Sequence, residues 1–266
     1  MMIKETNDDY ICKPYPGGIL YDTDSASLLK EFSDPAQGNT DDCCLIAALS
    51  AIDWTMGRTK IKITIQGTNY LVYFGKIYKK VTNTLSLDNN NNFEYAYSLN
   101  LDKELWPGIY EKATAIHIHG STADCKFDNV NWDGNPTRYL KTFSACKDTT
   151  LNSDLYFSIT RRCKDGKTLY PMVIWNENHC YTVLGVQTDG KIILRDPNPK
   201  EPTIPPNAIV SGSWEVQDHF LWDCGGDTPI ASRGKYTVDF GFGIFALSQN
   251  DLVNYFTHLT FVKVQA

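Results

Sequence analysis

The sequence has no long apolar run and no excess of positive charge. No segment approaches the roughly 18 uninterrupted apolar residues of a membrane-spanning helix, and the first ten residues lack the basic and then apolar stretches of a standard secretory signal. Lys and Arg number 25 against 31 Asp and Glu, and no basic run alternates with aromatic residues. We therefore expect a soluble protein, cytoplasmic or exported by a route without a standard signal peptide, and no nucleic acid partner.

Internal repeats are also absent, and low complexity is confined to the tract DNNNN at 88–92, which is typical of a solvated loop. The 266 residues, 42% of them hydrophobic, are enough to bury a core in one large domain or two lobes without disulfides. Frameworks of paired cysteines belong mainly to short secreted chains. We expect the eight cysteines to be reduced thiols, and the adjacent Cys43 and Cys44 are poorly placed to bridge each other.

Hydrophobic periodicity predicts helices mainly in the first half and strands in the second. The predicted helices cover 26–32, 43–54, 103–117 and 136–146, with a hairpin at 61–81. The predicted strands cover 155–160, 171–175, 179–187, 191–195, 236–245 and 259–264, the last after a short helix that Ser248 caps. The pattern indicates an α+β fold with a helical lobe at 1–147, a sheet-rich lobe at 148–266 and a cleft between them.

A cysteine at the start of the predicted helix at 43–54 is a candidate nucleophile. At this position the helix dipole and the free backbone N–H groups favour a thiolate on Cys43. Asp41 and Asp42 add negative charge nearby, so a partner imidazolium is needed to stabilise the thiolate. Taken alone, Cys43 is more typical of an ordinary buried core cysteine than of a nucleophile, and the residues around it change that interpretation.

The residues around Cys43 add a family resemblance. Residues 37–45 read QGNTDDCCL and resemble the calpain segment Gln-Gly-x-x-Gly-Asp-Cys-Trp-Leu, with Asp41 in place of Gly and Cys44 in place of Trp. In papain-related enzymes this spacing brings a Gln side chain beside the backbone N–H of the nucleophile. The resemblance therefore implies an oxyanion hole made by Gln37 and the Cys43 N–H.

Three further segments resemble calpains in the same order along the chain. They are LWPGIYEKA at 105–113, NHCYTVLGV at 178–186 and GIFALSQNDLVNYF at 243–256. A lone His at a strand start is usually structural, but the second segment gives His179 the position of the general base. The resemblance covers roughly 37–264 and implies the catalytic core of a calpain-like cysteine peptidase, with the papain-like arrangement of a helical N-terminal lobe and an antiparallel-sheet C-terminal lobe.

The third member of a triad should accept the Nδ1 proton of His179. Calpains use an Asn within Arg-Asn-Pro-Trp, and this chain reads RDPN at 195–198, which makes Asp196 the counterpart. An ideal turn at the Asp-Gly pair 189–190 places Asp196 opposite Val183, further along the strand than His179. The same register places Asn198 opposite Tyr181, so Asn198 stays open as the alternative third member.

The resemblance implies an endopeptidase that cleaves protein or peptide substrates through a thioester intermediate. A Cys-His-Asp set also serves transglutaminases and glutamine deamidases, which transfer the acyl group of a Gln side chain. The substitutions at Asp41 and Cys44 keep a third alternative open, an inactive pseudo-peptidase that acts as a binding module.

No cofactor is predicted, and calcium is the one cation that the resemblance brings into question. Residues 140–146 read LKTFSAC where calpains have Thr-Gly-Gly followed by Glu, so we expect calcium independence. His117 and His119 lack further residues at ligand spacing, which argues against zinc. The sequence contains no EF-hand loop, so a regulatory partner of that type would have to be a separate chain.

Overall fold

The computed structural model describes residues 10–20, 32, 34–57, 61–99, 104–122, 124–127, 129–144, 147–151, 154–220 and 231–263. Its helices are α1 (Cys43–Met56), α2 (Trp106–His119), α3 (Thr137–Ser144), α4 (Leu155–Thr160) and α5 (Gln249–Tyr255). Neighbouring strands are antiparallel throughout the described part of the chain. The α+β class is therefore confirmed. No helix in these ranges has the length and apolar character to cross a membrane.

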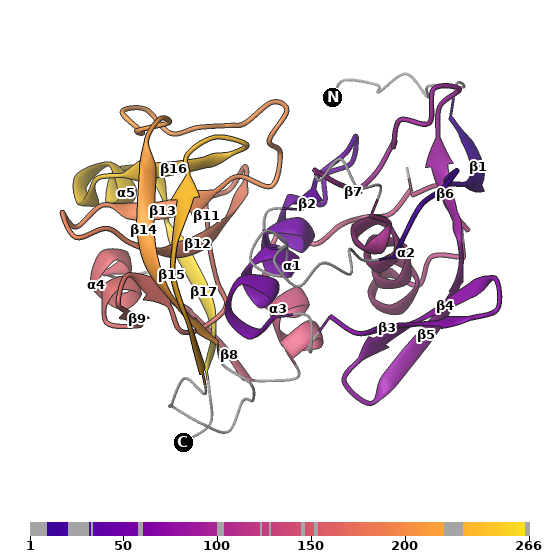
Figure 1. The fold of residues 1–266 in the computed structure, drawn as a ribbon, viewed down its shortest axis with the longest axis horizontal. Coiled ribbons are helices and arrows are strands. Elements are labelled where there is room, and N and C mark those ends of the chain that lie inside the picture. Colours follow the sequence, from indigo (N-terminus) through magenta and orange to yellow (C-terminus); the bar gives the residue numbers. More distant parts are fainter. Residues whose placement is uncertain are drawn as a thin grey trace.

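The largest sheet has eight strands and lies on the left of Figure 1. Its order is β16 (Ile244–Leu247), β13 (Ile192–Arg195), β12 (Cys180–Val186), β11 (Met172–Trp175), β17 (His258–Lys263) and β8 (Lys147–Leu151). Two short strands, β9 (Cys163–Lys164) and β10 (Lys167–Thr168), join it through β12. The predicted strands at 171–175, 179–187, 191–195 and 259–264 are confirmed as members of this sheet.

Four smaller sheets complete the described strands. One pairs β1 (Ile11–Pro14) with β6 (Thr84–Leu87), a second pairs β2 (Pro35–Ala36) with β7 (Tyr97–Ser98), and a third pairs β14 (Ser213–Phe220) with β15 (Ala231–Asp239). The fourth contains β3 (Ile63–Gln66), β4 (Asn69–Phe74) and β5 (Ile77–Thr82). The first half of the chain thus carries sheets as well as helices.

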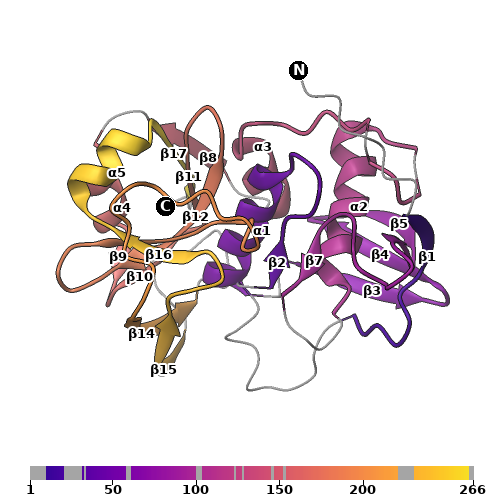
Figure 2. The same ribbon diagram turned by 90° about the horizontal axis from the view of Figure 1, so that it is seen from above.

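Helix α1 is buried on all sides. Every residue after Cys43 is buried, as expected for a helix that is apolar around its whole circumference. Figures 1 and 2 both show α1 between the eight-stranded sheet and α2. The Thr182 hydroxyl on β12 donates to the Ala47 carbonyl oxygen at 2.8 Å, and the Trp54 indole donates to the Leu184 carbonyl oxygen at 2.7 Å. These bonds fix the position of α1 on the sheet.

The two faces of β12 pack against different helices. Tyr181 and Val183 lie in a buried cluster with residues of α4 and α5. Cys180 belongs to the other cluster, which contains most of α1, and Thr182 bonds to α1 directly. This alternation is the period of two of a strand buried on both faces. It directs Cys180 toward α1 and Tyr181 away from it.

The hairpin between β12 and β13 does not have the register that an ideal Asp-Gly turn predicts. The loop has three residues, with Gly190 at φ 87°, and the Gln187 N–H donates to the Lys191 carbonyl oxygen at 2.8 Å. A β-bulge then shifts the register again between Val183 and Gly185. The observed pairs Thr182–Arg195 and Val183–Leu194 therefore place residue 196 at the level of 181 rather than 183.

Two other predicted elements differ in the structure, and local hydrogen bonds and backbone angles explain both differences. Residues 155–160 form helix α4 instead of a strand, because the Asp154 carboxylate accepts the Phe157 N–H at 3.0 Å and caps it, while Leu155 and Ile159 pack on one side. The predicted strand 236–245 is interrupted between β15 and β16, where Gly241 has φ 137°.

The predicted hairpin at 61–81 is a three-stranded sheet, because Gly67 and Gly75 both adopt positive φ and make two turns. The predicted helix at 26–32 lies outside the described residues, apart from Phe32. The helices predicted at 43–54, 103–117 and 136–146 are confirmed as α1, α2 and α3, with shifted ends. The Ser248-capped helix is confirmed as α5, since the Ser248 hydroxyl accepts the Asp251 N–H at 3.2 Å.

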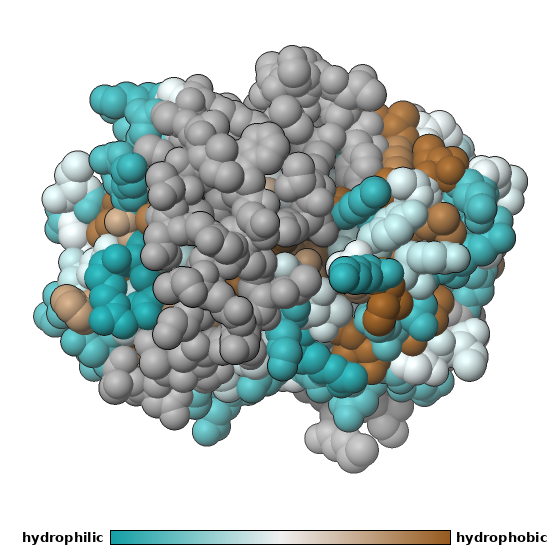
Figure 3. All heavy atoms as spheres, turned by 90° about the horizontal axis from the view of Figure 1, so that it is seen from below, coloured by the Kyte–Doolittle hydropathy of each residue, from teal (hydrophilic) through white to brown (hydrophobic). Residues whose placement is uncertain are grey.

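The β3–β4–β5 sheet buries one face and exposes the other. Val72, Phe74 and Val81 pack in the α1 and α2 cluster, whereas Ile65 and Ile77 are more than half exposed. Seen from below in Figure 3, brown hydrophobic patches on the right, where this sheet lies, are broken up by teal hydrophilic side chains. The apolar surface of this part of the molecule is therefore divided into small patches.

The bond between Thr182 and Ala47 gives a prediction about stability. Thr182→Val keeps the shape of the side chain but removes the hydroxyl that bonds to α1, so we expect the free energy of unfolding to fall by about 1 kcal/mol. Thr188→Val, at an exposed position in the hairpin loop, is the matched control and should change it by less than about 0.5 kcal/mol. Urea titration of both variants measures the difference, and equal midpoints would contradict the assignment.

Candidate active site

Cys43 is the first residue of α1, and its thiol is free and partly buried. The helix begins there because the Asp42 carbonyl oxygen accepts the backbone N–H groups of Leu45 and Ile46 at 2.8 and 3.1 Å. The Cys43 sulfur therefore lies at the positive end of the helix dipole. The structure thus gives Cys43 the local environment that the sequence predicts for it.

The loop before α1 is held at two points by the backbone. The Gln37 N–H donates to the Pro197 carbonyl oxygen at 2.8 Å, and the Asn39 N–H donates to the Glu94 carbonyl oxygen at 2.7 Å. A Cβ atom at Gly38 would lie 2.4 Å from the Glu94 carbonyl oxygen, so only glycine fits between these bonds. The loop consequently lies against the segment that follows β13.

His179 and Asp196 meet at the ends of two neighbouring strands. His179 directly precedes β12, Asp196 directly follows β13, and Nε2 of the imidazole lies 2.8 Å from Oδ1 of the carboxyl group. The expected bond at Nδ1 is wrong, because Asp196 meets the ring at its outer end. The bond to Asp196 uses Nε2 and leaves Nδ1 as the other ring nitrogen, and Cys43 is close enough to the imidazole to raise its pKa. Cys43, His179 and Asp196 therefore form one connected group.

The Asp196 carboxyl group is held by hydrogen bonds to both of its oxygens. It is fully buried, its Oδ1 also accepts the Asn198 N–H, and its Oδ2 accepts the Thr203 N–H, both at 2.7 Å. The Asn198 side chain instead accepts the Glu201 N–H at 3.3 Å. Of the two candidates, the structure thus brings the Asp196 side chain to His179, because the altered register of the β12–β13 hairpin moves Asp196 two residues closer along β12.

The surroundings of His179 favour its charged form. Burial by itself lowers the pKa of the imidazole, but the hydrogen bonds and charges of Asp196 and Cys43 outweigh burial and raise the pKa to about 9. His179 is therefore protonated at neutral pH. An imidazolium beside Cys43 is the partner that a thiolate at this position requires.

The Gln37 side chain lies in the same loop as Cys43. Its Nε2 donates to the Thr40 carbonyl oxygen, and its Oε1 is buried. One of the two amide protons is used in this bond, which leaves the other for a second acceptor. The structure thus directs part of the Gln37 amide to the backbone of the loop that precedes Cys43.

A buried carboxyl group behind Cys43 escaped the sequence analysis. Glu111 on α2 is fully buried, and burial, followed by the negative charge of Asp42, raises its pKa well above the usual value. Glu111 is therefore protonated, hydrogen-bonds to the Asp42 side chain and accepts the Ala96 N–H at 2.8 Å. The signal was present in the sequence, since Glu111 is the Glu of the LWPGIYEKA segment.

Two disulfides are present among the described residues, so the expectation of reduced thiols is wrong for four of the eight cysteines. Cys12 is bonded to Cys125, and Cys44 is bonded to Cys180. Separations of 113 and 136 residues hide these pairs in the sequence, and folding brings their Cα atoms to 5.9 and 5.0 Å. Cys163 is free, and the two remaining cysteines, at positions 146 and 224, lie outside the described residues.

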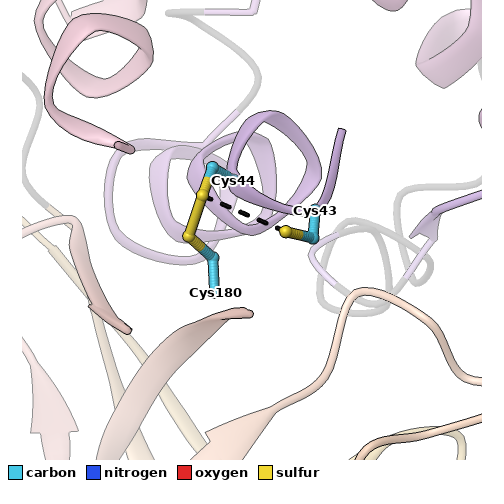
Figure 4. A group of neighbouring side chains, drawn as sticks. All are labelled: Cys43, Cys44 and Cys180. Atoms are coloured by element: carbon cyan, nitrogen blue, oxygen red, sulfur yellow. Dashed lines mark hydrogen bonds between the residues drawn. A yellow bond between two sulfur atoms is a disulfide. The ribbon is translucent and has the colours of Figure 1, made fainter. Parts of the chain in front are cut away.

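The second disulfide lies beside the candidate nucleophile, as Figure 4 shows. The Cys43 sulfur is 4.0 Å from the Cys44 sulfur, and the sulfurs of Cys43, Cys44 and Cys180 all lie within 4.8 Å of one another. Three thiolates at this spacing would suit a soft metal ion. Because Cys44 and Cys180 are bonded to each other, only Cys43 keeps a thiol for such a role.

The pKa of His179 gives a prediction about pH. Since the pKa is raised from 6.5 to about 9 on folding, the protonated imidazole stabilises the folded state fully below pH 6.5, and this stabilisation is lost as the pH rises through 9. Asp196→Asn should lower the pKa of His179, because the carboxylate charge is removed while burial remains. NMR titration of the imidazole C–H signals measures both values, and an unchanged pKa in the variant would contradict this account.

Comparison with known proteins adds no relative. The sequence matches no family model and no curated protein. The functional argument therefore depends on the geometry around Cys43 and on the sequence segments that resemble calpains.

Proposed function

We propose that this protein is a calpain-like cysteine peptidase, in which Cys43 is the nucleophile, His179 the acid and base, and Asp196 the group that orients His179. The observation that carries the proposal is the convergence of these three side chains from separate segments, with the imidazole between the thiol and the carboxyl group. The four ordered segments that resemble calpains support it. We further infer the papain-like arrangement of two lobes, 1–147 and 148–266, with the site between them.

In the first half of the reaction, the Cys43 thiolate attacks the carbonyl carbon of a peptide bond. The negative charge moves to the carbonyl oxygen, where the Cys43 backbone N–H and the second amide proton of Gln37 are the donors that stabilise it. The His179 imidazolium then gives its Nδ1 proton to the leaving nitrogen, the carbon–nitrogen bond breaks, and a thioester remains on Cys43.

In the second half, water attacks the thioester while neutral His179 takes its proton. The carbon–sulfur bond breaks, the acid product leaves, and the Cys43 thiolate and the His179 imidazolium are restored. Asp196 keeps Nε2 protonated through the 2.8 Å bond, so Nδ1 is the nitrogen that exchanges the proton in both steps. Its bonds to Asn198 and Thr203 hold the carboxyl group still while this happens.

Cleavage of an unfolded protein substrate tests the assignment of Cys43. We expect the wild type to cleave the substrate and Cys43→Ala not to cleave it. The wild-type rate should be the same with calcium and with a chelator. Cys163→Ala is the matched control, because burial raises the pKa of that thiol to about 12 and leaves it unreactive. Cleavage by Cys43→Ala at the wild-type rate would refute the proposal, and release of ammonia without cleavage would indicate transfer from glutamine side chains.

A side-by-side comparison of Asp196→Ala and Asn198→Ala tests the third role. Loss of the Asp196 carboxyl group frees the imidazole to change tautomer and orientation, so kcat should fall on the order of 10²-fold or more. Asn198→Ala should retain most of the activity, since its side chain bonds to the Glu201 N–H. Circular dichroism checks that both variants fold. A larger loss in Asn198→Ala would reverse the assignment.

A further inference from the structure

The disulfide between Cys44 and Cys180 joins the two chain positions that follow the two reacting side chains. Cys44 follows Cys43 at the start of α1, and Cys180 follows His179 at the start of β12. We propose that this disulfide is a positioning device, which fixes Cys43 against His179 and makes the reactivity of the pair depend on the redox state of the bond. This inference rests on the proposed function and concerns the same site.

The contacts between α1 and β12 run in order from the site to the far end of the helix. Cys44 is bonded to Cys180, Thr182 bonds to Ala47, and Trp54 bonds to the Leu184 carbonyl oxygen. The disulfide is therefore the link nearest to the reacting side chains. The next one, at Ala47, lies a full turn further along the helix.

The first turn of α1 needs such a link. The first turn of a helix has N–H groups without partners inside the helix, and a side chain at the N-cap position usually satisfies one of them. The Asp42 side chain makes no capping hydrogen bond to α1 and is instead paired with Glu111. Because helix ends fray without a cap, the covalent bond from Cys44 to the strand holds the turn that carries Cys43.

The catalytic rate should be sensitive to how closely the disulfide holds Cys43 to His179. Displacement of a reacting group by about 1 Å can reduce a catalytic rate about 100-fold. The Cys44 and Cys180 Cα atoms are 5.0 Å apart, and each is one residue from a reacting side chain, so the bond leaves little room for Cys43 and His179 to separate. Reduction by a dithiol, which is itself oxidised to a disulfide, transfers two electrons and two protons to the Cys44–Cys180 bond, gives two thiols, and removes the constraint.

The protein contains a matched control. The disulfide between Cys12 and Cys125 closes a loop of similar length, with a sequence separation of 113 against 136, so its removal should relax the unfolded chain to a similar degree. It links β1 to a segment that contains none of the three site residues. We therefore compare Cys44→Ser/Cys180→Ser with Cys12→Ser/Cys125→Ser. Both cysteines of each pair are replaced, so no new thiol is left near Cys43.

The experiment measures the rate at which iodoacetamide alkylates Cys43 at about pH 6, where a simple thiol with a pKa of about 8.5 is almost fully protonated. Mass spectrometry of the unreduced full-length protein first establishes the Cys44–Cys180 bond and then follows the label on Cys43. We expect fast alkylation in the wild type and in Cys12→Ser/Cys125→Ser, and at least about tenfold slower alkylation in Cys44→Ser/Cys180→Ser. In the same variant kcat should fall by about 10 to 100-fold, with a much smaller change in KM.

Three results would each overturn the inference. The first is that Cys44 and Cys180 are reduced in the purified protein. The others are that Cys44→Ser/Cys180→Ser keeps the alkylation rate and kcat of the wild type, or that both double variants lose them equally. Fast alkylation at pH 6 without cleavage of any substrate would instead remove the proposed function and leave the positioning role intact. If Cys44→Ser/Cys180→Ser does not fold, stepwise reduction of the folded wild type replaces it. The alkylation rate should then fall in proportion to the fraction of this disulfide reduced, and a constant rate would overturn the inference.

Discussion

The packing of α1 against β12 and β13 determines the positions of Cys43, His179 and Asp196, because each of these residues lies where one of the three elements begins or ends. Cys43 opens α1, His179 precedes β12, and Asp196 follows β13. Burial makes the packing specific, since a polar group enclosed in the core costs free energy unless it is hydrogen-bonded. The bonds from Thr182 to Ala47 and from Trp54 to Leu184 are satisfied in one register of the helix on the sheet. Any other register would leave these groups without partners.

A buried arginine also links β13 to α1 and adds a positive charge close to the site. Arg195 ends β13, is fully buried, and donates to the Ser50 hydroxyl of α1 and to the Pro35 carbonyl oxygen, each at 2.7 Å. Burial lowers its pKa to about 10, so it keeps its charge at neutral pH, while burial and a hydrogen bond to Glu104 raise the pKa of Asp34 to about 9. Asp34 is therefore largely neutral. Asp196 follows Arg195 in the chain and bonds to His179, so both of these basic side chains are close to it.

The sequence predicted the elements of the site better than their register. Apolar periodicity located α1 and the strands of the main sheet, because those segments are buried over their whole length. Apolar periodicity could not predict the β-bulge between Val183 and Gly185. The bulge depends on how β12 pairs with β10 and β13 and not on the conformational preferences of its own residues. The three-residue turn and this bulge together bring Asp196, and not Asn198, to His179. The prediction of a strand at 155–160 was wrong for a related reason, since a short apolar run of six residues fits a strand or a capped helix equally well.

The disulfide between Cys44 and Cys180 could have been expected from the predicted site. Once Cys43 and His179 are taken to meet, their chain neighbours Cys44 and Cys180 must also lie close together, and the alternation along β12 directs Cys180 toward α1. The expectation of reduced thiols came from the length of the chain and from the adjacency of Cys43 and Cys44, and it ignored this consequence of the predicted site. Two bonded pairs in the described part of the chain favour an oxidising environment over a reducing one.

The charge at the start of α1 depends on Glu111 remaining neutral. A Cys43 thiolate, Asp42 and Asp196 would bring three negative charges close together, and the His179 imidazolium, Arg195 and the helix dipole oppose them. A fourth charge on Glu111 would repel the charge of Asp42, and because Glu111 is fully buried this repulsion would be only weakly screened. Burial keeps the proton on Glu111, and that proton bonds to Asp42. The Glu of the LWPGIYEKA segment therefore has an electrostatic role at the candidate site as well as a place in the packing of α2.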